Sequence, residues 1–175
     1  GQKIKRLRIQ KGLTLEERFG NEGERVHETP SGLINSIGLQ NPGVDAFIRD
    51  DLPFLRAKDT AVIANLGGST IESYQEDLPY LLDKGTVIIA NAAGSAIEDY
   101  RLLAEALDAS AVDMIELNIS CPNVRHGGMA LGIRCDIAYE AVKKVREVCK
   151  KPLMVKLSPN AQDIVEMARC CEEAG

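Results

Sequence analysis

Four short apolar runs stand out in the hydrophobic pattern of this chain. They cover residues 61–65, 86–91, 114–118 and 153–157. Each run is rich in Val, Ile or Leu and lacks the polar alternation of a half-exposed strand, which is typical of strands buried on both faces of a parallel sheet. The pattern therefore predicts four buried parallel strands.

The stretches between these runs have the spacing of amphipathic helices. Apolar residues recur at helical intervals over 97–107, 137–149 and 164–171. Two further segments, 69–72 and 95–98, place a Ser three residues before a Glu, which is the signature of a capping box at a helix start. Strands that alternate with helices predict an α/β chain of βαβ units with right-handed crossovers.

The chain contains an internal repeat. Residues 51–74 align without gaps to residues 77–100, an offset of 26 residues, and the strand, its Asn, a glycine turn and a Tyr recur in both copies. The repeat is one strand–helix unit used twice. Two copies do not predict a solenoid, which needs about three stacked units. Pro79 falls inside the helix of the first copy, where we expect it to shorten or kink that helix.

Three of the four predicted strands end in Asn, at Asn65, Asn91 and Asn118, and the fourth carries Lys156 near its end. Ligands of parallel α/β folds bind at the carboxyl ends of strands. An amide offers both a donor and an acceptor to a planar polar ring, although Asn also starts many turns. Because the amide recurs at three strand ends, we interpret these residues as a ligand-binding rim.

Cys121 follows the third strand directly, in the segment Asn-Ile-Ser-Cys-Pro-Asn of residues 118–123. A loop thiol can act as a base once its surroundings stabilise the thiolate. Taken alone, a single loop cysteine is more often incidental than catalytic. Cys121 is therefore a candidate base whose role depends on the motifs around it.

The composition is that of a globular chain, with 175 residues, 45% hydrophobic and 27% charged, and a net charge of −5. No stretch approaches about 18 apolar residues, so we expect no membrane span. Residues 1–11 are basic, but the remaining residues carry a net charge of −10 and few aromatic side chains. We therefore expect no nucleic-acid partner, and interpret the basic segment as a solvated first strand or tail with Ile4, Leu7 and Ile9 facing the core.

The cysteines show no pairing pattern. They are Cys121, Cys135, Cys149, Cys170 and Cys171. None forms a CxxC pair, and the two histidines lie at no zinc-like spacing, so we expect no metal site. An odd number of unpatterned cysteines without a secretory signal is typical of a reducing compartment, which predicts a cytoplasmic protein.

Four long segments carry a resemblance to a known family. They are residues 11–21, 25–44, 113–132 and 151–168. With these motifs the chain resembles the class 1 dihydroorotate dehydrogenases, and most closely the class 1B catalytic subunit. The resemblance implies a (β/α)8 TIM barrel that holds FMN at the carboxyl ends of its strands. It also implies oxidation of dihydroorotate to orotate in pyrimidine biosynthesis, in which a base removes a proton while a hydride leaves for the flavin.

The resemblance also assigns roles to residues. Cys121 matches the catalytic base. The substrate positions are Lys11, Asn35, Ser36, Ile37, Gly38, Leu39 and Asn118, with Asn123 a further candidate. The FMN positions are Lys11, Gly12, Asn118, Lys156 and one of the two repeated amides, Asn65 or Asn91. Both copies fit the spacing of the family, so the sequence does not decide between these two amides.

The length bears on the barrel. A complete barrel usually needs about 250 residues, and the glycine-rich FMN-phosphate segment of the family is not found here. We therefore expect residues 1–175 to form a single partial barrel domain with one extra strand–helix unit, in which one copy is extruded or the barrel is open. We also expect weak or no turnover from this chain alone.

Partners follow from the same resemblance. A class 1B chain works with an electron-transfer subunit that carries FAD and an iron–sulfur cluster and uses NAD, so we expect a homo- or hetero-oligomer. Two other functions stay open. One is a related flavin barrel that acts on another reduced pyrimidine, and the other is a non-catalytic half-barrel that folds by association.

Overall fold

The computed structural model describes residues 6–13, 18–38, 40–68, 70–120 and 131–175, with the backbone alone described for residues 6–13 and 18. Five strands form one parallel sheet. In spatial order they are β1 (Arg6–Leu13), β6 (Thr60–Gly67), β7 (Val87–Ala92), β8 (Met114–Asn118) and β9 (Leu153–Lys156). The four predicted strands are confirmed as β6 to β9, and the basic N-terminal segment supplies the fifth strand.

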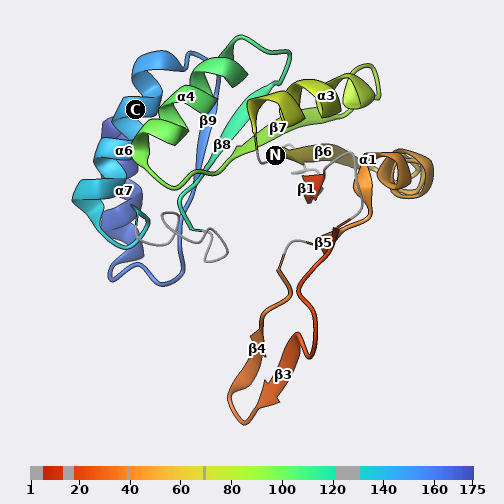
Figure 1. The fold of residues 1–175 in the computed structure, drawn as a ribbon, viewed down its shortest axis with the longest axis horizontal. Helices are drawn as coiled ribbons and strands as arrows, with labels where there is room; N and C mark the ends of the chain where they lie inside the picture. The colour runs from red at the N-terminus through yellow and green to blue at the C-terminus, as the bar shows by residue number, and fades with distance from the viewer. Residues whose placement is uncertain (1–5, 14–17, 39, 69, 121–130) are drawn as a thin grey trace.

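The main helices follow these strands and gather on one side of the sheet (Figure 1). They are α3 (Ile71–Leu81), α4 (Ile97–Asp108), α6 (Cys135–Val148) and α7 (Ile164–Ala174). The three helices predicted from apolar spacing are α4, α6 and α7, which are confirmed. The strand–helix alternation confirms the predicted α/β class.

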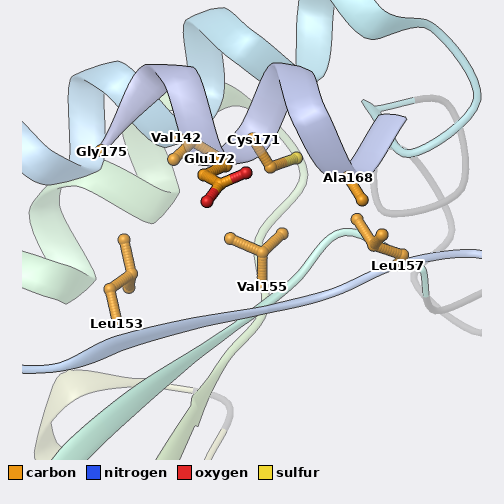
Figure 2. Close-up of a pocket in the computed structure, with 8 residues that line it drawn as sticks. All are labelled: Val142, Leu153, Val155, Leu157, Ala168, Cys171, Glu172 and Gly175. Carbon is orange, nitrogen blue, oxygen red and sulfur yellow. The ribbon is translucent and has the colours of Figure 1, made fainter. Parts of the chain in front are cut away.

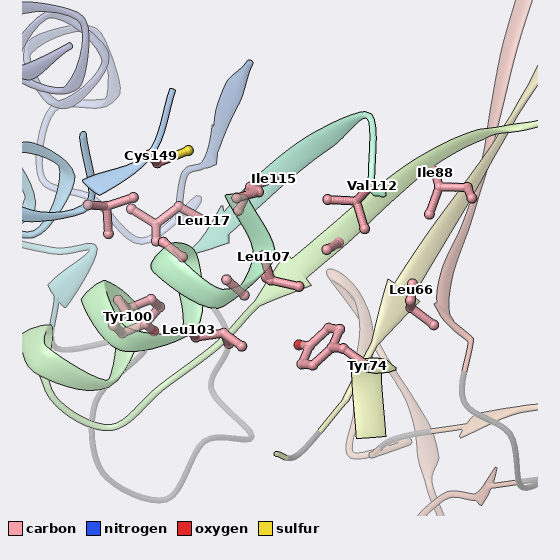
Figure 3. Close-up of a cluster of buried hydrophobic side chains, with 14 of the residues drawn as sticks. Leu66, Tyr74, Ile88, Tyr100, Leu103, Leu107, Val112, Ile115, Leu117 and Cys149 are labelled. Atoms are coloured by element: carbon pink, nitrogen blue, oxygen red, sulfur yellow. The ribbon is translucent and has the colours of Figure 1, made fainter. Parts of the chain in front are cut away.

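The core lies between the sheet and these helices (Figure 3). Successive side chains of a strand point to opposite faces. One set of alternate positions is apolar and packs against the helices: Ala64, Leu66, Ala90, Ala92, Ile115 and Leu117. The intervening positions of the same strands therefore face away from the helices, and these positions carry the predicted rim.

The sheet is open in the part of the chain that the structure describes. There β1 pairs only with β6, and β9 pairs only with β8, so each is an edge strand. Parallel strands with helices on one face correspond to part of a (β/α)8 barrel, as expected.

Both copies of the repeat belong to this sheet. The first copy supplies β6 and the start of α3, and the second supplies β7 and the start of α4. The two strands are hydrogen-bonded neighbours. Of the two arrangements expected, extrusion of one copy is therefore wrong, and an open sheet accommodates the extra unit.

The predicted caps are wrong by one residue. Helix α3 begins after Thr70, whose hydroxyl accepts from the backbone N–H of Ser73, while the Ser73 hydroxyl lies 3.2 Å from the Thr70 backbone nitrogen. Helix α4 begins after Ala96, and the Asp99 carboxylate accepts from the backbone N–H of Ala96. At α3 two residues of capping type, Ser69 and Thr70, are adjacent in sequence, and at α4 the Asp99 carboxylate takes the place of a cap side chain, so spacing alone did not fix the register.

Pro79 lies in the last turn of α3, and the helix ends two residues later at Leu81. Helix α3 has 11 residues, whereas its repeat equivalent α4 has 12. The expected shortening is therefore slight, because a proline in the last turn removes only one intrahelical hydrogen bond.

The chain between β1 and β6 forms an arm and a short helical segment. The arm contains the antiparallel hairpin β3 (Val26–Thr29) and β4 (Gly32–Asn35), with β2 (Arg18–Phe19) pairing β5 (Gln40–Asn41) at its base. Figure 1 shows the hairpin projecting away from the sheet. The helical segment consists of α1 (Gly43–Ala46), η1 (Phe47–Asp51) and α2 (Leu52–Arg56). No helix of the described residues is long and apolar enough to cross a membrane.

Candidate active site

The predicted rim residues meet on the face of the sheet that lies opposite the helices. Strand register places Asn91 beside Glu116 across β7 and β8, and Asn118 beside Lys156 across β8 and β9. Asn65 lies on the neighbouring strand β6. The structure therefore brings Asn65, Asn91, Asn118 and Lys156 together near the strand ends, and their role in binding a ligand stays a prediction.

Glu116 lies at the centre of the resulting network. Its Oε2 accepts from Asn65 Nδ2 at 3.0 Å, and its Oε1 accepts from Asn91 Nδ2 at 2.5 Å. Asn91 in turn accepts at Oδ1 from Asn118 Nδ2, at 3.1 Å. The ammonium of Lys156 lies 3.8 Å from Glu116 Oε1. One carboxylate thus binds both repeated amides and faces one cation.

Burial makes these contacts necessary. Glu116 is 1% exposed and Asn65 is 0% exposed, whereas the Lys156 side chain is 27% exposed. A buried carboxylate is costly unless it is hydrogen-bonded and paired with a positive charge. The two amides and the ammonium meet this requirement, and Lys156 is the partly exposed member of the network.

Glu116 was not among the candidates from sequence. The available signal was a single charged residue in the middle of an apolar run of strand type, at residues 114–118. Acidic residues are almost never fully buried unless they are paired. A Glu within a predicted buried strand therefore indicates a functional or structural partner elsewhere in the chain.

Two helix tyrosines hold the strand ends from behind. The hydroxyl of Tyr74 in α3 donates to the backbone carbonyl of Asn91, and that of Tyr100 in α4 donates to the carbonyl of Asn118. Burial raises the pKa of Tyr74 to about 12. The Tyr74 hydroxyl therefore stays protonated at neutral pH and remains a donor.

The predicted substrate segment lies on the arm, apart from this network. Asn35, Ser36 and Ile37 are exposed. The hydrogen bonds described for this segment are local: the Ser36 backbone donates to the Arg25 carbonyl, and Asn21 donates to the carbonyls of Ser36 and Ile37. The structure thus brings four of the cofactor candidates together, Asn65, Asn91, Asn118 and Lys156, and leaves the segment 35–38 on the arm.

Several other candidates lie partly or wholly outside the described residues. Lys11 and Gly12 lie on β1, of which the backbone alone is described, and Gly38 is half-buried at the base of the arm. Leu39, Cys121 and Asn123 lie outside the described residues. Their roles stay predictions.

A pocket of about 240 Å³ lies on the helix side of β9, away from the network (Figure 2). It is lined by Val142, Leu153, Val155, Leu157, Ala168, Cys171, Glu172 and Gly175. Burial raises the pKa of the Cys171 thiol, which therefore stays protonated and unreactive at neutral pH. With a mostly apolar lining and no activated group, this pocket is not the candidate active site.

Parallel strands with helices on one face, and a polar network near the carboxyl ends of the strands on the other, are typical of a barrel-type α/β protein. Comparison of the sequence with known protein families identifies the family to which this chain belongs. The dihydroorotate dehydrogenase family matches residues 7–175, so the chain belongs to that family. The family is flavin-dependent.

Curated relatives agree. The chain is 50% identical over 165 residues to the dihydroorotate dehydrogenase B (NAD(+)) catalytic subunit of Petrotoga mobilis, covering 94% of this chain and 46% of that protein. It is 46% identical over 168 residues to the subunit of the same name from Geotalea uraniireducens, covering 95% and 47%. For Thermoanaerobacter pseudethanolicus the identity is 42% over 167 residues, covering 95% and 47%. The chain therefore spans about half the length of the curated relatives it matches.

Proposed function

We propose that this chain carries the flavin-facing part of an FMN-dependent dihydroorotate dehydrogenase, which oxidises dihydroorotate to orotate in pyrimidine biosynthesis. The observation that supports this most directly is the network of Asn65, Asn91, Asn118 and Lys156 around Glu116 at the ends of β6 to β9. Four strands contribute to it, which is the position at which barrel enzymes bind cofactors.

The chemistry of these groups fits a flavin ring. An isoalloxazine ring presents carbonyl oxygens and a ring N–H along one edge, which require N–H donors and an acceptor. The amides of Asn91 and Asn118 offer donors. The Oδ1 atoms of the same two amides each accept a hydrogen bond in the network, and each has a second lone pair for the ring N–H. Lys156 offers a positive charge at the partly exposed edge of the network.

The residues divide the proposed reaction between them. FMN, when bound, accepts the hydride. Lys156 places positive charge beside the flavin edge, where an ammonium stabilises negative charge. Cys121 removes the proton from the ring carbon of dihydroorotate with its thiolate. Asn118 shares its amide between flavin and substrate, and Lys11 and Gly12 contact the flavin from β1.

The arm supplies the proposed substrate contacts. Asn35, Ser36, Ile37, Gly38 and Leu39 bind the carboxylate-bearing pyrimidine. Backbone N–H groups and short polar side chains of this kind suit an anionic ring with carbonyl and N–H groups. Because the arm projects from the sheet (Figure 1), substrate binding requires the arm to approach the strand ends.

The proposed electron acceptor is a separate subunit. The curated relatives are named as NAD(+) catalytic subunits. We propose that an electron-transfer subunit with FAD and an iron–sulfur cluster passes electrons from this chain to NAD, in a hetero-oligomer. A cytoplasmic location stays a prediction.

FMN titration of the purified chain tests the cofactor. We expect a saturable change in the visible absorption of FMN, which Asn118→Ala weakens and Gln75→Ala, an exposed change on α3, leaves unaltered. An absence of saturable binding by the unmodified chain would contradict the proposal.

Anaerobic addition of dihydroorotate to the FMN-loaded chain tests the reaction. We expect the flavin to be bleached, more slowly than in full-length relatives, and Cys121→Ser to slow this further without changing FMN affinity. Bleaching by another dihydropyrimidine, and not by dihydroorotate, would assign the chain to the related flavin barrels instead.

A further inference from the structure

The duplication brings two equivalent amides to one carboxylate. Asn65 and Asn91 occupy the same position of the repeat, 26 residues apart. They donate to different oxygens of Glu116, Asn65 to Oε2 and Asn91 to Oε1. Each oxygen of the carboxylate therefore accepts from one of the two copies of a single structural unit.

A carboxylate fixes the orientation of the amides that bind it. An Asn side chain can present either its carbonyl oxygen or its NH2 group to a neutral polar neighbour, whereas an ionised carboxylate only accepts hydrogen bonds. Glu116 therefore forces Asn65 and Asn91 to present Nδ2. The remaining atom of each amide, Oδ1, must then point away from Glu116.

This orientation is passed along the strand ends. Asn91 Oδ1 accepts from Asn118 Nδ2 at 3.1 Å. Asn118 Oδ1 accepts from the backbone N–H of Ser120 at 3.4 Å and lies 3.3 Å from its hydroxyl. Every hydrogen bond in the series from Ser120 through Asn118 and Asn91 thus points toward Glu116. If Glu116 were replaced by a side chain that can also donate, nothing would require Asn91 and Asn118 to donate toward residue 116.

The two repeated amides differ in their surroundings. Asn65 is fully buried, and its Oδ1 has no hydrogen-bond partner among the described residues. Asn91 is half-buried and lies between Glu116 and Asn118. Asn91 is therefore the more accessible of the two amides, and Asn65 is fully buried on β6, in register with Ile89.

We propose that Glu116 is the positioning residue that sets the direction of the amide series, and that the duplication has divided the amide's role between the two copies. Asn91 contacts the flavin, and Asn65 supports Glu116. The assignment of Asn91 rests on the proposed function, whereas the positioning role of Glu116 does not.

Side-chain amide NMR spectra of the 15N-labelled chain test the positioning role without any ligand. We expect the Nδ2 protons of Asn65 and Asn91 to resonate apart from those of exposed Asn side chains, because each donates to a charged acceptor. Asn65→Ala and Asn91→Ala assign the two resonances. Resonances at the positions of exposed amides in the unmodified chain would overturn the proposal.

Glu116→Gln tests the direction of the series. The new side chain has the same shape but presents an NH2 group to one of the two Asn side chains, so at least one amide must turn over. We expect the resonances of Asn65 and Asn91 to move, because both lose a charged acceptor, and that of Asn118 to move with them where Asn91 turns over, while the backbone spectrum stays folded. Glu140→Gln, an exposed change on α6, should move none of them. Unmoved resonances in a folded Glu116→Gln chain would overturn the proposal.

FMN titration of the matched pair tests the division of roles. We expect Asn91→Ala to weaken FMN binding about tenfold, as for one lost hydrogen bond, and Asn65→Ala to weaken it less than about threefold. Equal losses, or a larger loss in Asn65→Ala, would overturn the division. If the unmodified chain shows the shifted amide resonances but binds no FMN, the proposed cofactor is wrong and the positioning role of Glu116 stands.

Discussion

The hydroxyl of Tyr74 donates a hydrogen bond to the backbone carbonyl of Asn91, and so ties the helix of the first repeat unit to the strand end of the second. The next unit does the same, because Tyr100 donates to the carbonyl of Asn118 at 2.9 Å. The tyrosine and asparagine of the repeat thus act together. Each tyrosine binds the backbone of the Asn at the end of the next strand along the chain, and the side chain of that Asn belongs to the network around Glu116.

Tyr74→Phe and Tyr100→Phe should each lower the free energy of unfolding by about 1–2 kcal/mol, since each removes one hydrogen bond and leaves a carbonyl without its donor. Urea denaturation measures both losses. Tyr80→Phe is the control, because the Tyr80 side chain is exposed on the same helix as Tyr74. Losses no larger than that of the control would show that the tyrosines do not hold the strand ends.

Alkaline pH should destabilise the chain partly through Tyr74. Burial raises the pKa of Tyr74 from 10.0 to about 12 in the folded chain. The folded state therefore keeps this proton more tightly, so the contribution to stability is complete below about pH 10 and is lost as the pH rises toward about 12.

Tyr74→Phe removes this contribution. Between about pH 9 and about pH 11, the unmodified chain should lose about 1 kcal/mol more of its unfolding free energy than Tyr74→Phe does. Urea denaturation at the two pH values gives the difference. Equal losses in the two chains would contradict the raised pKa.

Much of the fold could be predicted from the sequence, because the spacing of apolar residues indicates which positions of a strand or helix are buried. The strands β6 to β9 and the helices α4, α6 and α7 follow from local apolar spacing. The cap positions failed by one residue, since Ser, Thr and Asp near Thr70 and Ala96 offer several local hydrogen-bonding arrangements. Local pattern thus predicts where an element lies more reliably than the residue at which it begins.

The sequence predicted only those candidate-site residues that lie near the carboxyl ends of strands. The amides at Asn65, Asn91 and Asn118 were found because parallel strands bring their carboxyl ends together. Glu116 was missed because its partners are distant in sequence, Asn65 by 51 residues and Asn91 by 25. A contact between residues so far apart in sequence produces no local pattern from which it could be predicted.

Asp108 should stabilise the junction between α4 and β9. Its Oδ1 accepts from the backbone N–H groups of Lys150 and Lys151, at 2.7 and 2.8 Å. These hydrogen bonds, above all the one from Lys151, lower the pKa of Asp108. The contribution to stability is therefore present above the ordinary pKa of an aspartate and is lost as the pH falls below it.

Asp108→Ala should lower the free energy of unfolding by about 1–2 kcal/mol at neutral pH, and by less in acid. Asp108→Asn should recover part of the loss, because an amide oxygen still accepts hydrogen bonds. Glu140→Ala on the exposed side of α6 is the control. A loss that is the same at neutral and acidic pH would indicate that the carboxylate charge plays no part.

Lys156→Gln should affect FMN binding more than folding. The Lys156 ammonium lies 3.8 Å from Glu116 Oε1, and its side chain is 27% exposed, so solvent weakens the ion pair. We expect FMN affinity to fall about tenfold or more, which corresponds to about 1.4 kcal/mol, because the proposed function places the ammonium beside the flavin edge. The unfolding free energy should fall by about 1 kcal/mol or less.

Lys144→Gln provides the matched control for this change. Lys144 pairs with Glu147 at 3.1 Å on the surface of α6, on the opposite side of the sheet from the network. It should have a similarly small effect on stability and none on FMN affinity. Since both variants lose one positive charge, a general effect of net charge on FMN, itself an anion, would weaken both equally. Only a selective loss in Lys156→Gln supports a direct role at the flavin.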